Sequence, residues 1–267
     1  MPLPKEPLVL TGGCNCRSIR YRVSVPPEAD RPIAPYHKPG TTTDTVSDLP
    51  RIPVVLLDHC NDCRRATASV VPMCLVTDAS KVELSVLPKD YLKNSHATSD
   101  EARAWQPLAS VTDSFENENV SSTESNTTLG HYISSANRNR WFCTHCGTPL
   151  GYSVNASAYP ESWKSSKVPR MFDFWLGTLD REWLEQEWMR PDHAVWCHFG
   201  VDWVSDLVKN GARRLVGEGE DGSGHGKGSE TDDVREVKTE PLPRHPLFMV
   251  DQQEGEDVHE WLMALGK

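Results

Sequence analysis

Three pairs of closely spaced cysteines constrain how this chain can fold. They follow the patterns CxC, CxxC and CxxC and lie far apart in the 267-residue sequence: Cys14 and Cys16, Cys60 and Cys63, Cys143 and Cys146. In a reducing compartment, thiol pairs at such spacing bind a metal more often than they form disulfides. The pattern therefore predicts zinc binding and a fold in which distant segments meet around the metal.

The remaining composition agrees with a reducing, cytoplasmic location. Residues 1–10 contain prolines and an acidic residue instead of a basic start followed by an apolar core, so no signal peptide is expected. No apolar run reaches the length of a transmembrane helix. The formal net charge of −10 disfavours nucleic acid or an anionic membrane surface as the main partner. We expect a small-molecule substrate, with the oligomeric state left open.

Short β-strand patterns dominate the sequence. Apolar and polar residues alternate over 19–25, and 52–57 is a continuous apolar run that is typical of a buried strand. Further strands are predicted at 68–77, 82–87, 129–134, 140–142, 149–154, 172–176 and 194–199. Helices are few, and one begins at Asp202, a residue type that caps helices. The predicted fold class is mainly β.

The composition also divides the chain into regions. We expect one domain over 8–216, with loop insertions at about 26–51 and 94–128. Residues 217–240 are rich in Gly, Ser, Glu and Asp, which is typical of a disordered linker. The segment 241–267 contains a capping pattern and helical apolar spacing around Trp261, so it is expected to form a short helix.

The middle cysteine pair is predicted to form a reactive metal site. Strand alternation places Asp58 and Cys60 on one side, and Cys63 returns toward them from the turn that follows. Three protein ligands leave a tetrahedral zinc with one open position, as in catalytic sites. His59 is a reserve ligand and Asp62 a weaker one. The alternatives are a structural zinc completed by a distant residue, or reduced thiols without a metal.

The outer two pairs are predicted to form a structural site. Each pair lies in a turn beside a strand, and together they supply four thiolates, the number that closes a structural zinc shell: Cys14, Cys16, Cys143 and Cys146. Pairing of these turns would make folding depend on the metal. The two remaining cysteines, Cys74 and Cys197, are each isolated in an apolar strand pattern and are expected to be buried small hydrophobes.

The order of these motifs resembles a known family. Gly-x-Cys-x-Cys at 12–16 is followed by His-Cys-x-x-Cys-Arg at 59–64, Trp-Phe-Cys-x-x-Cys-Gly at 141–147 and Gly-Thr-Leu-Asp at 177–180. Over about 12–215, the chain is similar to the glutathione-dependent formaldehyde-activating enzymes, a family that includes centromere protein V. The resemblance implies a β-tent of small antiparallel sheets stapled by zinc, with one structural and one catalytic zinc site.

The chain departs from the family pattern at two positions. The resemblance places the structural site on the four outer cysteines and the three-cysteine catalytic site on Asp58, Cys60 and Cys63. Asp58 thus stands where the family has a cysteine, and Arg17 stands where it has a glycine. A carboxylate is a harder ligand than a thiolate and donates less charge, so a metal bound by Asp58 should be a stronger Lewis acid.

These observations predict a zinc-dependent carbon–sulfur lyase acting on the adduct of a thiol, such as glutathione, and a small aldehyde. Asp58, Cys60 and Cys63 would hold the catalytic metal. Arg64 would bind a substrate carboxylate, unless it forms a structural or surface salt bridge. Two histidines near the cysteine motifs, His59 and His145, are candidates for moving protons, although packing is the commoner role of such histidines.

Two other classes of function fit the same residues. One is a non-catalytic, zinc-stabilised module that binds a protein through its polar loops and its carboxy-terminal helix. The other is a thiol-redox protein in which Cys60 and Cys63 cycle through a disulfide. One tightly held zinc per chain would favour the binding module, and two zincs that exchange at different rates would favour the enzyme.

Overall fold

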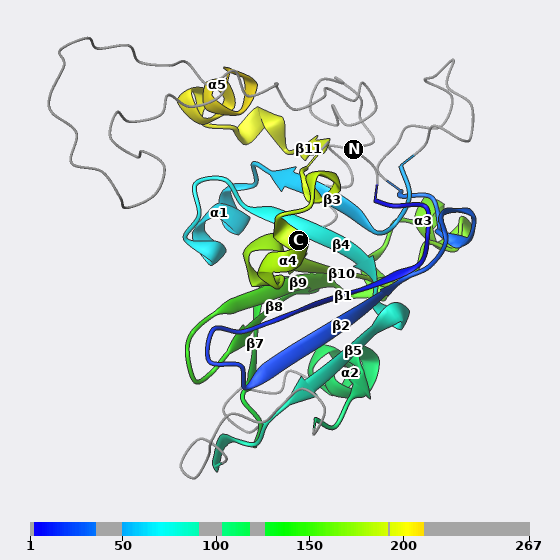
Figure 1. The fold of residues 1–267 in the computed structure, drawn as a ribbon, viewed down its shortest axis with the longest axis vertical. Coiled ribbons are helices and arrows are strands. Elements are labelled where there is room, and N and C mark those ends of the chain that lie inside the picture. Colours follow the sequence, from blue (N-terminus) through cyan, green and yellow to red (C-terminus); the bar gives the residue numbers. More distant parts are fainter. Residues whose placement is uncertain (1–2, 36–49, 91–102, 118–125, 192, 211–267) are drawn as a thin grey trace, which may run out of the picture.

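The computed structural model describes residues 3–35, 50–90, 103–117, 126–191 and 193–210. These residues form two β-sheets with short helices around them, so the predicted mainly β fold class is confirmed (Figure 1). The predicted linker at 217–240 and the predicted helix within 241–267 lie outside the described residues, as do 36–49 of the first expected insertion.

The smaller sheet has four strands in the order β1-β2-β5-β6, and the larger has seven in the order β11-β3-β4-β10-β9-β8-β7. The strands of the smaller sheet are β1 (Leu8–Gly13), β2 (Ile19–Val25), β5 (Val82–Val86) and β6 (Gln106–Pro107). Those of the larger are β3 (Val54–Asp58), β4 (Met73–Asp78), β7 (Leu129–Ser135), β8 (Arg138–Cys143), β9 (Pro149–Val154), β10 (Met171–Trp175) and β11 (His193–Val195). All the pairings are antiparallel except β11 with β3, so the larger sheet is mixed rather than small and antiparallel.

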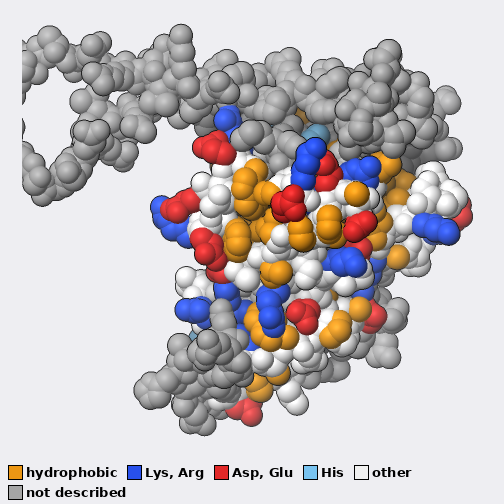
Figure 2. Space-filling view, turned by 45° about the vertical axis from the view of Figure 1, so that its right-hand side comes forward, with side chains coloured by type: hydrophobic (Ala, Val, Ile, Leu, Met, Phe, Trp, Pro, Cys, Tyr) orange, Lys and Arg blue, Asp and Glu red, His pale blue; other side chains and the backbone are white. Residues whose placement is uncertain are grey.

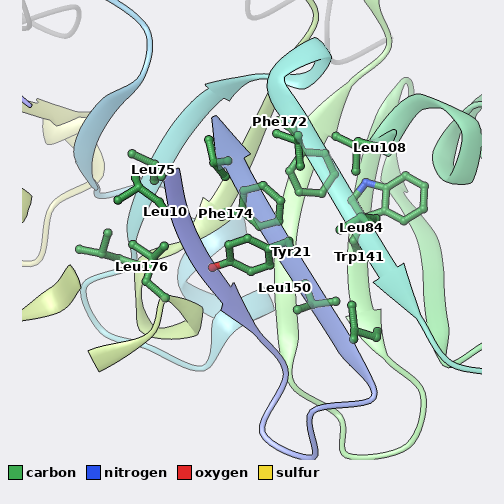
Figure 3. Close-up of a cluster of buried hydrophobic side chains, with 14 of the residues drawn as sticks. Leu10, Tyr21, Leu75, Leu84, Leu108, Trp141, Leu150, Phe172, Phe174 and Leu176 are labelled. Carbon is green, nitrogen blue, oxygen red and sulfur yellow. The ribbon is translucent and has the colours of Figure 1, made fainter. Parts of the chain in front are cut away.

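The main hydrophobic core lies between the two sheets. Strand alternation directs Tyr21 of the smaller sheet toward Phe174 of the larger one, and their rings stack with centroids 3.9 Å apart (Figure 3). Trp141, only 1% exposed, extends the same core and donates from its indole nitrogen to Ser153. Burial of each such large side chain stabilises the fold by about 1.5–3 kcal/mol.

A second core covers the opposite face of the larger sheet, and this face carries the middle cysteine pair. It buries Val54, Leu56, Cys63, Val76 and Trp175. Five α-helices are present in the described part of the chain: α1 (Asn61–Thr67), α2 (Leu108–Asn117), α3 (Glu161–Ser165), α4 (Arg181–Leu184) and α5 (Asp202–Asn210). Helix α1 follows directly on β3, so the end of a buried strand positions its first turn.

Several predicted elements differ from the observed ones. The strand expected at 68–77 begins only at Met73: α1 ends at Thr67, its C-cap Ala68 is left-handed, and a short irregular segment leads into the strand. The strand expected at 194–199 ends at Val195 and continues as a 3₁₀ helix, Cys197–Phe199, so the expectation that Cys197 is buried in a strand was wrong. Cys74 is buried in β4 as predicted.

The second expected insertion, 94–128, belongs in part to the fold. Residues 103–117 of it contain β6 and α2, and Leu108 at the start of α2 is fully buried against the main core. Thr112, one turn later, is also fully buried and donates from its hydroxyl to the Leu108 carbonyl. Helix α2 was not predicted from the sequence, because it has few apolar residues. Residues 91–102 and 118–125 lie outside the described part.

The Gly-Thr-Leu-Asp motif joins the two sheets. Asp180 accepts two hydrogen bonds from the Arg20 guanidinium, at 2.8 and 2.6 Å, and one from the Thr11 hydroxyl at 2.5 Å. Its backbone N–H also donates to the Thr11 carbonyl. The hydrogen bonds from Arg20 and Thr11 lower the pKa of Asp180. The motif therefore holds the β1–β2 hairpin against the end of β10, which fixes the turn that carries the first cysteine pair.

Two features bear on possible partners. None of the helices in the described residues is both long enough and apolar enough to cross a membrane. On the face shown in Figure 2, acidic and basic side chains are interspersed with hydrophobic ones.

Candidate metal centres

The four outer cysteines come together, as predicted. The turn between β1 and β2 supplies Cys14 and Cys16, and the end of β8 with the following turn supplies Cys143 and Cys146; their sulfurs all lie within 4.8 Å of one another. The Cys14–Cys16 and Cys16–Cys143 sulfur distances are 3.5 and 3.7 Å. Four sulfurs at about 2.3 Å from a tetrahedral zinc would be about 3.8 Å apart. The group therefore has the size and the ligand chemistry of a closed metal site.

The backbone of each turn aims N–H groups and sulfurs inward. Gly147 adopts φ +74°, which lets its N–H return to the Cys143 carbonyl. In the other turn Arg17 adopts φ +62°, at the position where the family pattern has glycine. A left-handed non-glycine residue costs about 1–2 kcal/mol. The Arg17 carbonyl accepts a hydrogen bond from Arg103 at 2.8 Å, which helps to hold this conformation.

The thiols of this group share protons in the absence of a metal. A hydrogen bond from Cys14, with further donors from Ser18 and the backbone, lowers the pKa of Cys143 to about 4. The same pairing with Cys143, together with burial, raises the pKa of Cys14. The Ser18 hydroxyl lies 3.2–3.6 Å from three of the sulfurs. Metal binding requires deprotonated thiols, so the lowered pKa of Cys143 favours it.

The middle group also assembles, in a different local structure from the one predicted. Asp58 ends β3, Cys60 is the N-cap of α1 and Cys63 lies in the first turn of this helix, where a plain turn was expected. Their ligand atoms lie within 4.8 Å of one another, and Asp58 and Cys63 are each 6% exposed. Asp58 Oδ1 accepts the Cys60 N–H at 2.7 Å, which fixes the strand-to-helix junction. Three convergent ligands can hold a metal ion with a position left open.

The pKa values of the two thiols in this group are shifted in opposite directions. The hydrogen bond from Cys63 and the backbone N–H groups at the start of α1 lower the pKa of Cys60 to about 7, although burial and Asp58 oppose this effect. The pKa of Cys63 is raised by its pairing with Cys60, by burial and by Asp58. Cys60 is therefore the more reactive thiol when no metal is present.

The other predicted site residues lie around this group with different roles. Arg64 points from α1, and its Nε is buried without a hydrogen-bond partner among the described residues. His59 lies outside the ligand group and packs near Gly200, and its N–H bonds to the Val195 carbonyl. Asp62 is exposed on α1 outside the group, and His145 is exposed in the outer cysteine turn. The group of convergent ligands is therefore Asp58, Cys60 and Cys63.

Sequence reading missed three polar residues on the same sheet face. Arg140 of β8 donates to Cys63, and the strand register places it opposite Tyr152 of β9, which in turn lies opposite Asp173 of β10. Alternation along the strand was the available signal for Asp173, which interrupts the apolar residues of β10. Arg140 gave no such signal, because it follows two polar residues, Arg138 and Asn139, in β8. The strand order that brings them beside α1 is not visible in the sequence.

We expect the Asp173→Asn variant to gain stability relative to wild type as the pH rises. Burial, and then the Asp58 carboxylate, raise the pKa of Asp173 to about 8, while Arg140 opposes the shift. A carboxyl with a raised folded-state pKa stabilises the fold fully only below its unfolded pKa of about 4, and this contribution is lost as the pH rises toward 8. With a discount for partial exposure, the variant should gain about 1–3 kcal/mol between pH 5 and 8.5.

Urea unfolding of both proteins at each pH measures this difference. The gain should be smaller in metal-loaded protein, because a cation bound beside Asp58 offsets the negative charge that Asp173 senses. A difference that stays constant with pH would contradict a raised pKa for Asp173.

Comparison with known proteins identified no relative: no model of a known protein family matches the chain, and no curated protein matches it significantly.

Proposed function

We propose that this protein is a zinc-dependent carbon–sulfur lyase that joins or splits a thiol and a small aldehyde. The observation that carries the proposal is the presence of two unlike ligand groups in one fold. Four thiols are the donor set of a closed structural zinc, whereas two thiols and one carboxylate leave a position for a substrate. The order of the cysteine motifs, which resembles that of the formaldehyde-activating enzymes, supports the same reaction class.

The chain's own residues would supply binding and orientation. Asp58, Cys60 and Cys63 would hold the metal, which when bound provides a Lewis acid with an open position for a thiol or a carbonyl oxygen. Arg64 is half-buried on α1, and its Nη2 makes a long contact of 3.4 Å to Asn61. The Nη groups of its guanidinium would bind a carboxylate, such as those of glutathione.

The reaction proposed is an addition and its reversal. The thiol sulfur forms a bond to the carbonyl carbon and the thiol proton moves to the carbonyl oxygen, so no external oxidant or reductant is needed. Formaldehyde and glutathione are the first pair to test, because a small aldehyde needs little space beside a buried metal group. The alternative without catalysis, a zinc-stabilised binding module, predicts no acceleration of the reaction in the same assay.

The test is the rate at which ¹³C-formaldehyde and glutathione interconvert with their adduct, measured by NMR exchange at a known metal content per chain. Wild type should accelerate the exchange at least about tenfold, and Cys60→Ser should return it to the uncatalysed rate. Arg64→Met should raise KM with little change in kcat, whereas Arg65→Met, at the next and exposed position on α1, should change neither.

Two results would overturn the proposal. One is wild type that holds two metals and accelerates no pairing of formaldehyde, glyoxylate or acetaldehyde with glutathione or cysteine. The other is acceleration that survives in Cys60→Ser.

A thiol-redox function is a second candidate, because Cys60 is the N-cap of α1 and its pKa is lowered to about 7. A reactive thiolate at a helix N-terminus with a second thiol three residues later is the arrangement of disulfide oxidoreductases. Metal-free protein would then form a Cys60–Cys63 disulfide reversibly and would reduce a model disulfide. Activity in this assay that persists after the metal is lost from Cys60 and Cys63 would favour the redox function over the lyase.

A further inference from the structure

Arg140 makes a contact that no sequence motif indicates. Its guanidinium reaches from β8 across the outer face of the larger sheet, and Nη1 and Nη2 lie 3.4 and 3.5 Å from the sulfur of Cys63. Arg140 is only 4% exposed. A buried guanidinium with two N–H groups directed at one sulfur is a charge-assisted contact in which the arginine is the donor.

Neighbouring side chains hold this guanidinium in place. Nε donates to the Ser134 hydroxyl at 3.3 Å, from the adjacent strand β7. The guanidinium carbon lies 4.5 Å from the ring centre of Tyr152, its cross-strand neighbour, and 5.9 Å from that of Trp175. Cation–π contacts of this kind are stronger when both partners are shielded from water. These contacts therefore hold the Arg140 guanidinium in the position where it meets Cys63.

The charge of the ligand group explains what such a contact can do. Asp58 and the two thiolates carry three negative charges when they bind a metal, so a divalent ion leaves one in excess. The Arg140 cation balances that excess. Hydrogen bonds to a ligand sulfur also withdraw electron density from it, so a metal bound there retains more of its positive charge.

We propose that Arg140 is a positioning residue of the middle centre, which orients Cys63 as a ligand and makes the bound metal a stronger Lewis acid. The inference rests on the proposed function only in requiring a metal at Asp58, Cys60 and Cys63. Asp58 and Arg140 act in the same direction, because the carboxylate donates less charge than the cysteine of the family pattern and the arginine withdraws charge from Cys63.

The test uses cobalt(II) in place of zinc, because sulfur-to-cobalt charge-transfer bands report the electron density on the ligand sulfur. The spectrum of Cys60→Ser is subtracted in each case to remove the contribution of the outer four cysteines. We expect Arg140→Met to shift the remaining band to longer wavelength and Arg140→Lys to give a smaller shift, since lysine keeps the charge but not the paired donors. Arg138→Met, two residues earlier on the same strand, is the matched control, because Arg138 Nη1 bonds to the Ala136 carbonyl.

The outcomes separate this inference from the lyase proposal. If wild type shows no band that depends on Cys60, the inference and the metal-dependent lyase both fail. If wild type shows the band and its wavelength is the same in Arg140→Met as in Arg138→Met, only the role of Arg140 is overturned.

A folding defect in Arg140→Met does not remove the test. Near-ultraviolet circular dichroism identifies such a defect, and Arg140→Lys then decides: a shifted band supports the inference and an unshifted band overturns it. If Arg140→Lys also loses its tertiary structure, Arg140 serves the fold and the inference is wrong.

Discussion

Replacement of Cys143 by serine is expected to unfold the protein. Its sulfur is buried, 3.7 Å from that of Cys16, and the two residues are 127 positions apart in the chain. A structural zinc contributes about 10–16 kcal/mol to folding. A domain of this size has a total stability of about 5–15 kcal/mol, so loss of the outer centre exceeds what packing alone can hold. Circular dichroism and metal analysis of the purified variant measure the effect.

A matched variant and a chelator make this prediction sharper. Cys197→Ser removes a half-buried cysteine outside both ligand groups and should keep the fold and the full metal content. A strong chelator added to wild type should first remove metal from the open middle centre, with little loss of structure, and later unfold the chain as the outer centre empties. A metal-free protein that melts at the same temperature as wild type would contradict a structural role for the outer cysteines.

The ligand groups could be predicted from sequence because the determining information is local. A CxC or CxxC spacing within one turn places both sulfurs on one side of it, and the second pair only needs to meet the first. The strand into Asp58 was equally readable, since a continuous apolar run is a buried strand in most folds. The contacts by which Asp180 joins the two sheets through Arg20 and Thr11 could not be predicted. Arg20 and Asp180, for example, lie 160 positions apart in the sequence.

Helix α1 shows where local reading was incomplete. Cys60 to Thr67 has no apolar periodicity, so the segment was read as a turn. It nevertheless has Asp62 in the first turn and Arg64 and Arg65 in the last, which complement the helix dipole. This charge pattern is a weaker indication of a helix than a periodic pattern of buried apolar residues, and it did not lead to a prediction of α1. The helix matters for Cys60, because its first backbone N–H groups add to the larger effect of the Cys63 thiol in lowering the pKa of Cys60.

Arg140 and Asp173 show what lay beyond sequence reading altogether. Asp173 lies within the apolar strand β10 and Arg140 within the half-polar strand β8, and their meeting depends on the register of β8, β9 and β10. Register across a sheet is fixed by the whole hydrophobic pattern and the turns, not by the residues themselves. The charged residues that surround the middle ligand group thus come from strands that the cysteine motifs do not describe.

The last prediction separates two roles of Asp58. Its Oδ1 accepts the Cys60 N–H at 2.7 Å, and the same carboxylate is one of the three convergent ligands. Asp58→Asn keeps an oxygen that can accept the N–H but loses the anionic ligand. We expect this variant to have a melting temperature close to that of wild type. It should nevertheless lose one metal per chain and the thiol–aldehyde activity. Asp58→Ala should lose the same metal and also about 1–2 kcal/mol of stability, because the buried N–H is left without its acceptor.

Metal analysis, calorimetry and the NMR exchange assay on the two variants decide between these roles. If Asp58→Asn and Asp58→Ala both keep two metals, Asp58 serves only the junction between β3 and α1, and the third ligand must come from elsewhere. If both lose the metal but only Asp58→Ala is destabilised, one side chain orders the backbone and completes the metal site. An aspartate ligand in place of a thiolate would then give the metal stronger Lewis acidity, in the same direction as the charge withdrawal proposed for Arg140.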